Sequence, residues 1–85
     1  MDAVVKRVVL DVLKPHEPNA LDFSRTLAEQ GRGYRIKLTI EEMDEKTQST
    51  VIEIEGENID FDTIIAAIQR MGGSVHSIDE VVVEG

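Results

Sequence analysis

The 85-residue chain contains no cysteine and no tryptophan, and its aromatic residues are one tyrosine and two phenylalanines. Without cysteine there is no disulfide framework, no thiolate ligand and no thiol nucleophile. So few aromatic rings argue against the stacking platforms that bind single-stranded RNA. No apolar run approaches the roughly 20 residues that a membrane-spanning helix needs. These absences leave a domain that is held together by an ordinary hydrophobic core.

Positive charge is also scarce, since 9 Lys and Arg residues face 17 Asp and Glu residues and give a formal net charge of −8. Binding to nucleic acid or to an anionic membrane depends on clustered Lys and Arg, so the charge argues against both partners. The length fits a single domain over residues 1–85. A domain this small is marginally stable by itself, and assembly of subunits would add stability.

Hydrophobic periodicity predicts six elements in the order β-α-β-β-α-β. The strands are expected at residues 3–14, 34–43, 49–55 and 75–83, and the helices at 19–30 and 60–71. Right-handed crossovers turn this order into one α+β domain with the ferredoxin-like fold. We expect a four-stranded antiparallel sheet in the order 4-1-3-2, with both helices on one face.

The helix ends carry specific signals. Asn19 and Asp60 are expected N-caps, because their short polar side chains can accept the first free backbone N–H groups. Gly31 fits the left-handed residue after the first helix, and Gly72-Gly73 ends the second helix.

Two features are predicted within the strands. In the central hairpin a loop of three or five residues would keep the isoleucine faces together and place Lys37 opposite Glu53 or Glu55. In the last strand a bulge near Asp79-Glu80 would bring Ile78 onto the face of Val81 and Val83.

Both histidines are expected at one edge of the sheet. In the predicted topology this edge collects His16, Glu17, Gly33, residues 55–58 and His76. Imidazoles with carboxylates can bind zinc or another divalent ion, such as calcium or magnesium. The alternative is that His16 is a solvated loop residue and His76 a hydrogen-bonded strand residue, because neither lies in a ligand-spaced motif.

The face of the sheet without helices is the expected subunit interface. The first strand is expected to place Val5, Val9 and Leu13 there, beside part of the valine run Val81, Val82 and Val83. A sheet with an uncovered apolar half indicates self-association, and the last strand is also an open edge. The alternative is a monomer with an ordinary mixed face.

One partial motif is better explained by the start of a helix. Asn58, Asp60 and Asp62 imitate the start of a calcium loop, but Thr63 stands at its glycine position and Gln69 at its final glutamate position. The start of a helix explains these acids better.

Three segments resemble an archaeal family, the domain of unknown function 211. They are residues 8–18 (VVLDVLKPHEP), residues 59–62 (IDFD) and residues 72–82 (GGSVHSIDEVV). The resemblance covers essentially the whole chain and implies a ferredoxin-like fold, a cytoplasmic setting and ring-like homo-oligomers. It implies no activity.

These observations favour a non-enzymatic homo-oligomeric module that binds a metal ion or small ligand at a subunit boundary. The candidate ligands are His16, Glu17, His76, Asp79 and Glu80, of which Asp79 and Glu80 would lie near a neighbouring copy. One alternative is a small metal-assisted enzyme that uses His16, Glu17 and His76. Another is a purely structural interaction ring, which predicts no small-molecule site.

Overall fold

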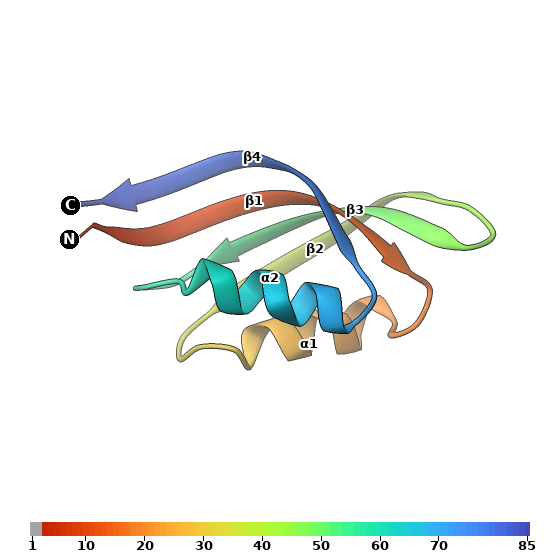
Figure 1. The fold of residues 1–85 in the computed structure, drawn as a ribbon, viewed down its shortest axis with the longest axis horizontal. Coiled ribbons are helices and arrows are strands. Elements are labelled where there is room, and N and C mark those ends of the chain that lie inside the picture. The colour runs from red at the N-terminus through yellow and green to blue at the C-terminus, as the bar shows by residue number, and fades with distance from the viewer. Residues whose placement is uncertain (1–2) are drawn as a thin grey trace.

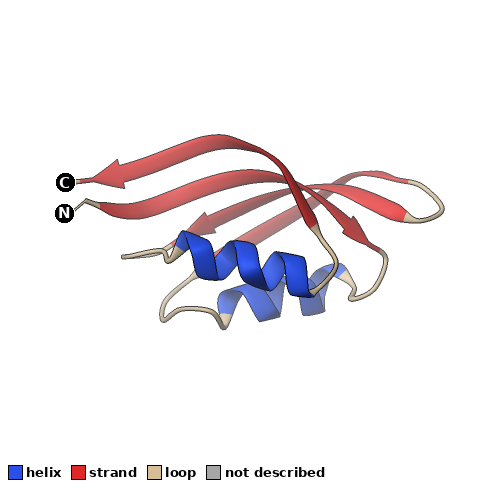
Figure 2. Ribbon diagram, in the orientation of Figure 1, coloured by secondary structure: helices blue, strands red, loops and turns tan. Residues whose placement is uncertain are grey.

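The computed structural model describes residues 3–85. Its strands and helices are β1 (Val4–Pro15), α1 (Ala20–Ala28), β2 (Arg35–Met43), β3 (Thr47–Glu55), α2 (Phe61–Arg70) and β4 (Ser74–Glu84). The strands form one antiparallel sheet in the order β2-β3-β1-β4, and both helices cover the same face of it (Figures 1 and 2). The predicted ferredoxin-like α+β fold is confirmed.

The core lies between the sheet and the helices. Alternate residues of β1 and β3 point into it, because successive side chains of a strand face opposite sides. Residues of α1 and α2 at helical spacing complete it. The buried apolar residues are Val8, Leu10, Val12, Phe23, Leu27, Ile52, Ile54, Ile59, Ile64, Ala67 and Ile68.

Both predicted N-caps are confirmed. The Asn19 side chain accepts the N–H of Asp22 at 2.8 Å, and the Asp60 side chain accepts the N–H of Thr63 at 3.2 Å. Gly72, with φ of +85°, ends α2 as expected.

The predicted role of Gly31 is wrong, because the left-handed residue after α1 is Gly33, with φ of +75°. A side chain at Gly31 would instead overlap the ring of Tyr34. Gly31 therefore gives that ring room to pack against the backbone.

The central hairpin has the predicted pairing. Lys37 lies opposite Glu53, and residues 44–46 connect the two strands. The register also shifts by one between Ile40 and Glu42, a bulge that the sequence did not predict.

The predicted bulge in β4 is confirmed at Asp79. Val9 pairs with Glu80 and Leu10 pairs with Ile78, so Asp79 is the extra residue. Ile78 and Val81 are thereby opposite Leu10 and Val8, on the face that carries the helices.

The expected place of Val5 is wrong. Val5 pairs with Val83 and Arg7 pairs with Val82, so Lys6 is an extra residue in β1 that reverses the alternation before Arg7. Val5 therefore packs against the core, and Val83 is on the same face.

The face of the sheet without helices, called here the open face, carries the side chains that alternate with the core residues. Val9, Leu13 and Val82 belong to it, as expected, because they alternate with Val8, Val12 and Val81.

The expectation that both histidines share one edge of the sheet with Gly33 and residues 55–58 is also partly wrong. The end of β1 pairs with the start of β3, at Pro15 and Thr47, whereas Arg7 pairs with Glu55 at the far end of these strands. Gly33 and residues 55–58 therefore lie at the end of the sheet opposite to His16. The reason is that neighbouring antiparallel strands run in opposite directions.

The outline of the molecule is elongated, with extents of 43 × 22 × 17 Å. The start of β1 and the end of β4 form a two-stranded ribbon that projects past the helices (Figure 1). Among residues 3–85 no helix has the length and apolar character needed to cross a membrane.

Candidate functional site

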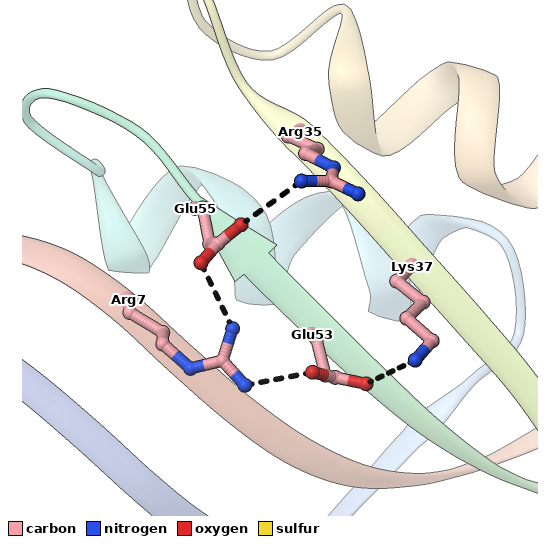
Figure 3. Close-up of a pocket in the computed structure, with 5 residues that line it drawn as sticks. All are labelled: Arg7, Arg35, Lys37, Glu53 and Glu55. Carbon is pink, nitrogen blue, oxygen red and sulfur yellow. Dashed lines mark hydrogen bonds and ion pairs between the residues drawn. The ribbon is translucent and has the colours of Figure 1, made fainter.

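The open face carries two hollows that differ in charge. The first, the charged hollow, has a volume of about 240 Å³ and is shown in Figure 3. It is lined by Arg7, Arg35, Lys37, Glu53 and Glu55, which project from β1, β2 and β3. The alternation of charged residues with core residues in these strands places all five on this face.

Arg7 is the centre of the charged hollow. Its guanidinium donates to Glu80 at 2.5 Å, to Glu53 at 2.7 Å and to Glu55 at 3.0 Å. Glu80 and, after it, Glu53 raise the pKa of Arg7 further above its usual range. The hydrogen bond from Arg7, with a smaller effect of Lys37, lowers the pKa of Glu53. Both shifts favour the charged forms of Arg7 and Glu53, which suits this pair to binding rather than to proton transfer.

Arg35 and Lys37 are held more loosely. Arg35 is 3.8 Å from Glu55 and Lys37 is 3.6 Å from Glu53, and their side chains are 80% and 67% exposed. Exposed pairs at such distances are weak, so both cations can contact a further partner at little cost.

The second hollow, the acidic hollow, has a volume of about 380 Å³. It lies at the other end of the open face. It is lined by Asp11, Leu13, Glu41, Glu42, Ser49 and His76. Three carboxylates and one imidazole suit a positively charged ligand. In residues 3–85, however, no three His, Asp or Glu side chains converge closely enough to hold a metal ion.

His16 does not join this hollow. Its Nε2 donates to the carbonyl of Asp44 at 2.7 Å, and its Nδ1 accepts from the amide of Gln48 at 3.2 Å. His16 thus contacts the β2–β3 hairpin, while His76 is exposed in the acidic hollow. The two histidines contact different residues, although both are near the same end of the sheet.

The other predicted ligands are also separate. Glu17 is exposed in the turn after β1, and Asp79 accepts a hydrogen bond from the Ser77 hydroxyl at 2.8 Å. Glu80 is paired with Arg7 in the charged hollow. The structure therefore does not bring the five predicted ligand residues together in one copy.

Lys14 is a buried polar residue that the sequence analysis did not single out. Its side chain is fully buried and donates to Gln48 at 2.9 Å and to the Pro15 carbonyl at 2.8 Å, with the Phe23 ring 5.5 Å away. Burial lowers the pKa of Lys14, and Glu17 partly opposes this change. The signal was available, because Lys14 continues the alternation of Leu10 and Val12.

An apolar groove of about 210 Å³ lies on the helix side of the sheet, beside the start of α2. It is lined only by apolar residues: Val5, Val8, Phe61, Ile78, Val81 and Val83. The groove is bordered by Ile78, Val81 and Val83 of β4, which is an edge strand of the sheet.

Comparison with known proteins gives two matches. The model of the family domain of unknown function 211, described as "Uncharacterized ArCR", matches residues 6–85. Uncharacterized protein MJ0319 of Methanocaldococcus jannaschii is 44% identical over 78 residues, which are 92% of this chain and 80% of that protein. The matched family range includes both hollows on the open face and all of β4. Neither description assigns an activity.

Proposed function

This chain belongs to the uncharacterised domain of unknown function 211 family, and on that premise we propose that it is a non-enzymatic module that forms homo-oligomers and binds a cation at a boundary between copies. The observation that carries the proposal is the open edge strand β4. Four of its apolar residues are exposed: Ile78 at 51%, Val81 at 57%, Val82 at 39% and Val83 at 52%. A long apolar edge strand is a template for pairing with another chain.

The acidic hollow supports the ligand part of the proposal. It presents the carboxylates of Asp11, Glu41 and Glu42 beside the imidazole of His76. Calcium and magnesium take several oxygen ligands, and zinc takes imidazole with carboxylate. Because residues 3–85 of one copy do not supply three converging ligands, the ligand would be bound where a second copy closes the hollow.

The contacts favour a module over an enzyme. In the described part of the chain, hydrogen bonds from serine and threonine hydroxyls lead to backbone carbonyls or aspartates, and none reaches a histidine. A hydroxyl nucleophile needs such a base within reach. His16 is engaged with the hairpin on both ring nitrogens.

Native mass spectrometry of the purified protein tests this function. We expect an oligomer whose excess mass is lost on chelation and returns with calcium, magnesium or zinc. The variant His76→Ala should reduce metal retention, whereas His16→Ala, a matched control outside the acidic hollow, should not. A monomer at micromolar concentration would contradict the assembly. An oligomer that takes up none of the three ions would contradict the cation site.

A further inference from the structure

We propose that copies of this chain join head to tail, with β4 of one copy paired antiparallel to β2 of the next copy. The occupant of the exposed β4 edge is therefore the opposite edge of an identical chain. This inference rests on the proposed homo-oligomeric function and specifies the two surfaces that meet.

The first support is the direction of the two edge strands. In the strand order β2-β3-β1-β4 of residues 3–85, β2 is paired only with β3 and β4 only with β1. Each neighbouring pair is antiparallel, so β2 and β4 run in opposite directions within one copy. A second copy in the same orientation then presents β2 antiparallel to β4 and keeps its helices on the same face. The sheet continues without a change of layer.

The second support is the match between apolar residues. If Val83 is set opposite Ile36 of the next copy, then Val81 falls opposite Leu38. The bulge at Asp79 then brings Ile78 opposite Ile40 of that copy. Ile36, Leu38 and Ile40 pair within their own copy with residues of the core face of β3, so these contacts all lie on the helix side. Ile40 is itself 37% exposed.

The third support is charge complementarity on the open face. In the same register Glu84 falls opposite Arg35 of the next copy, and Val82 falls opposite Lys37. Glu80 and Glu84 then flank Lys37 diagonally, within reach of its long side chain. Arg35 and Lys37 are the two cations that their own copy holds loosely, at 3.8 and 3.6 Å. The apolar match and the charge match thus select the same register.

The pairing also explains how the acidic hollow could be completed. His76 is an extra residue at a further register shift of β4, because Asp11 pairs with Ser77 and Val12 with Val75. In the proposed pairing His76 falls beside Glu41 and Glu42 of the next copy. Within its own copy, His76 already lines the acidic hollow together with Glu41 and Glu42. In a head-to-tail assembly, each boundary would therefore bring the His76 imidazole of one copy close to the Glu41 and Glu42 carboxylates of the next copy. Such contacts use both edges of every copy and close into a ring when the rotation between copies permits.

Cysteine cross-linking tests the register, because the natural chain contains no cysteine. Directly opposed residues of antiparallel strands have Cα atoms about 4.5 or 5.5 Å apart, which a disulfide can span. The double variant Lys37→Cys/Val82→Cys should form a ladder of covalent oligomers under mild oxidation. Each single variant should form no covalent dimer, because the two thiols come from different edges.

Charge reversal is a second test that does not rely on thiols. Arg35→Glu and Glu84→Lys should each raise the concentration at which the oligomer dissociates by on the order of tenfold. The double variant Arg35→Glu/Glu84→Lys should return it close to the wild-type value, because the opposed charges are restored with reversed sign. Circular dichroism of each variant checks that the monomer fold is retained.

The results that overturn this inference differ from those that overturn the proposed function. A covalent dimer of Lys37→Cys alone or of Val82→Cys alone would show pairing of identical edges and refute the head-to-tail contact. Additive weakening in the double charge variant would refute the register. In each case an intact wild-type oligomer would still support self-association. A monomeric wild type would contradict both the head-to-tail contact and the proposed homo-oligomeric function.

Discussion

At the scale of single residues, Lys14 shows how a charge is accommodated in this core. Its methylene groups continue the apolar row of β1, and its ammonium group donates to Gln48 and to the Pro15 carbonyl. Gln48 then presents its amide N–H to His16. The lysine therefore fixes the orientation of the Gln48 amide, and Gln48 fixes which ring nitrogen of His16 is free of a proton.

Truncation of Lys14 should be costly. Lys14→Ala leaves a cavity and an unsatisfied Gln48 oxygen, and it should lower the free energy of unfolding by about 2–4 kcal/mol. Lys14→Met keeps the volume and removes the buried charge but leaves the same Gln48 oxygen unsatisfied, so its cost should be smaller than that of Lys14→Ala. Urea denaturation of both variants measures the difference. Equal losses would show that packing of the side-chain stem contributes little.

The titration of Lys14 should change the free energy of unfolding at alkaline pH. Burial lowers its pKa in the folded state below the ordinary value of 10.5. Between the lowered pKa and 10.5 the unfolded chain binds more protons, so the free energy of unfolding should rise with pH in that window. Lys14→Met should lack this rise. A wild-type curve parallel to that of Lys14→Met from pH 8 to 10.5 would contradict the assignment.

At the scale of elements, the β2–β3 hairpin is closed by one side chain. The Asp44 carboxylate accepts the N–H groups of Lys46 and Thr47, both at 2.8 Å. The bond from Thr47, followed by that from Lys46, lowers the pKa of Asp44 below its ordinary value of 3.8. Its stabilisation is therefore present above pH 3.8 and is lost as the pH falls through the lowered pKa.

Asp44→Asn provides the test for the hairpin. An asparagine keeps an oxygen acceptor for the turn but does not titrate, so the variant should lose less stability than the wild type between pH 4 and pH 2. Thermal unfolding across this range measures the slopes. Identical slopes would mean that other carboxylates account for the acid sensitivity.

The start of α2 depends on its cap. Asp60→Ala removes the acceptor for the Thr63 N–H and should lower the free energy of unfolding by about 1 kcal/mol. Asp62 lies in the first turn of α2, so Asp62→Ala loses only a favourable interaction with the helix dipole and should cost at most about 0.5 kcal/mol. Chemical denaturation separates the two, and an equal cost would contradict the capping role.

Elements were predictable from the sequence because each has its own periodic pattern, cap or turn residue. Asn19, Asp60 and Gly72 all do what their positions indicate, and the bulge at Asp79 follows from a broken alternation. The bulge at Lys6 was not predicted, because the neighbouring Val-Val, Lys-Arg and Val-Val pairs of residues 4–9 do not show where the alternation shifts, and the bulge moved Val5 to the core face.

The candidate site was harder to predict, because it depends on which strand ends meet. His16 was expected beside residues 55–58 and instead contacts Asp44 and Gln48. The charged hollow was visible only in part, since the lysine–glutamate pair was expected but the three carboxylates on Arg7 come from two separate strands. Side-chain contacts between distant strands leave no periodic signal in the sequence.

At the scale of the whole molecule, assembly should depend on the β4 edge. Val81→Lys introduces a charge at a residue that is 57% exposed in one copy, so the monomer should stay folded while the oligomer dissociates. Leu21→Lys on α1, 60% exposed, is the matched control and should leave assembly unchanged. Sedimentation velocity compares the two variants. An intact Val81→Lys oligomer would place the interface elsewhere.

The neighbouring positions of β1 and β4 also bear on how the chain folds during its synthesis. β1 is the first strand of the domain and β4 the last, yet they pair along most of their lengths. While the chain is growing, β1 can find only β3, and one of its edges stays unsatisfied until β4 has left the ribosome. The domain should therefore acquire its full cooperativity only once β4 has left the ribosome, and the nascent intermediate without β4 is the species most exposed to wrong strand pairing.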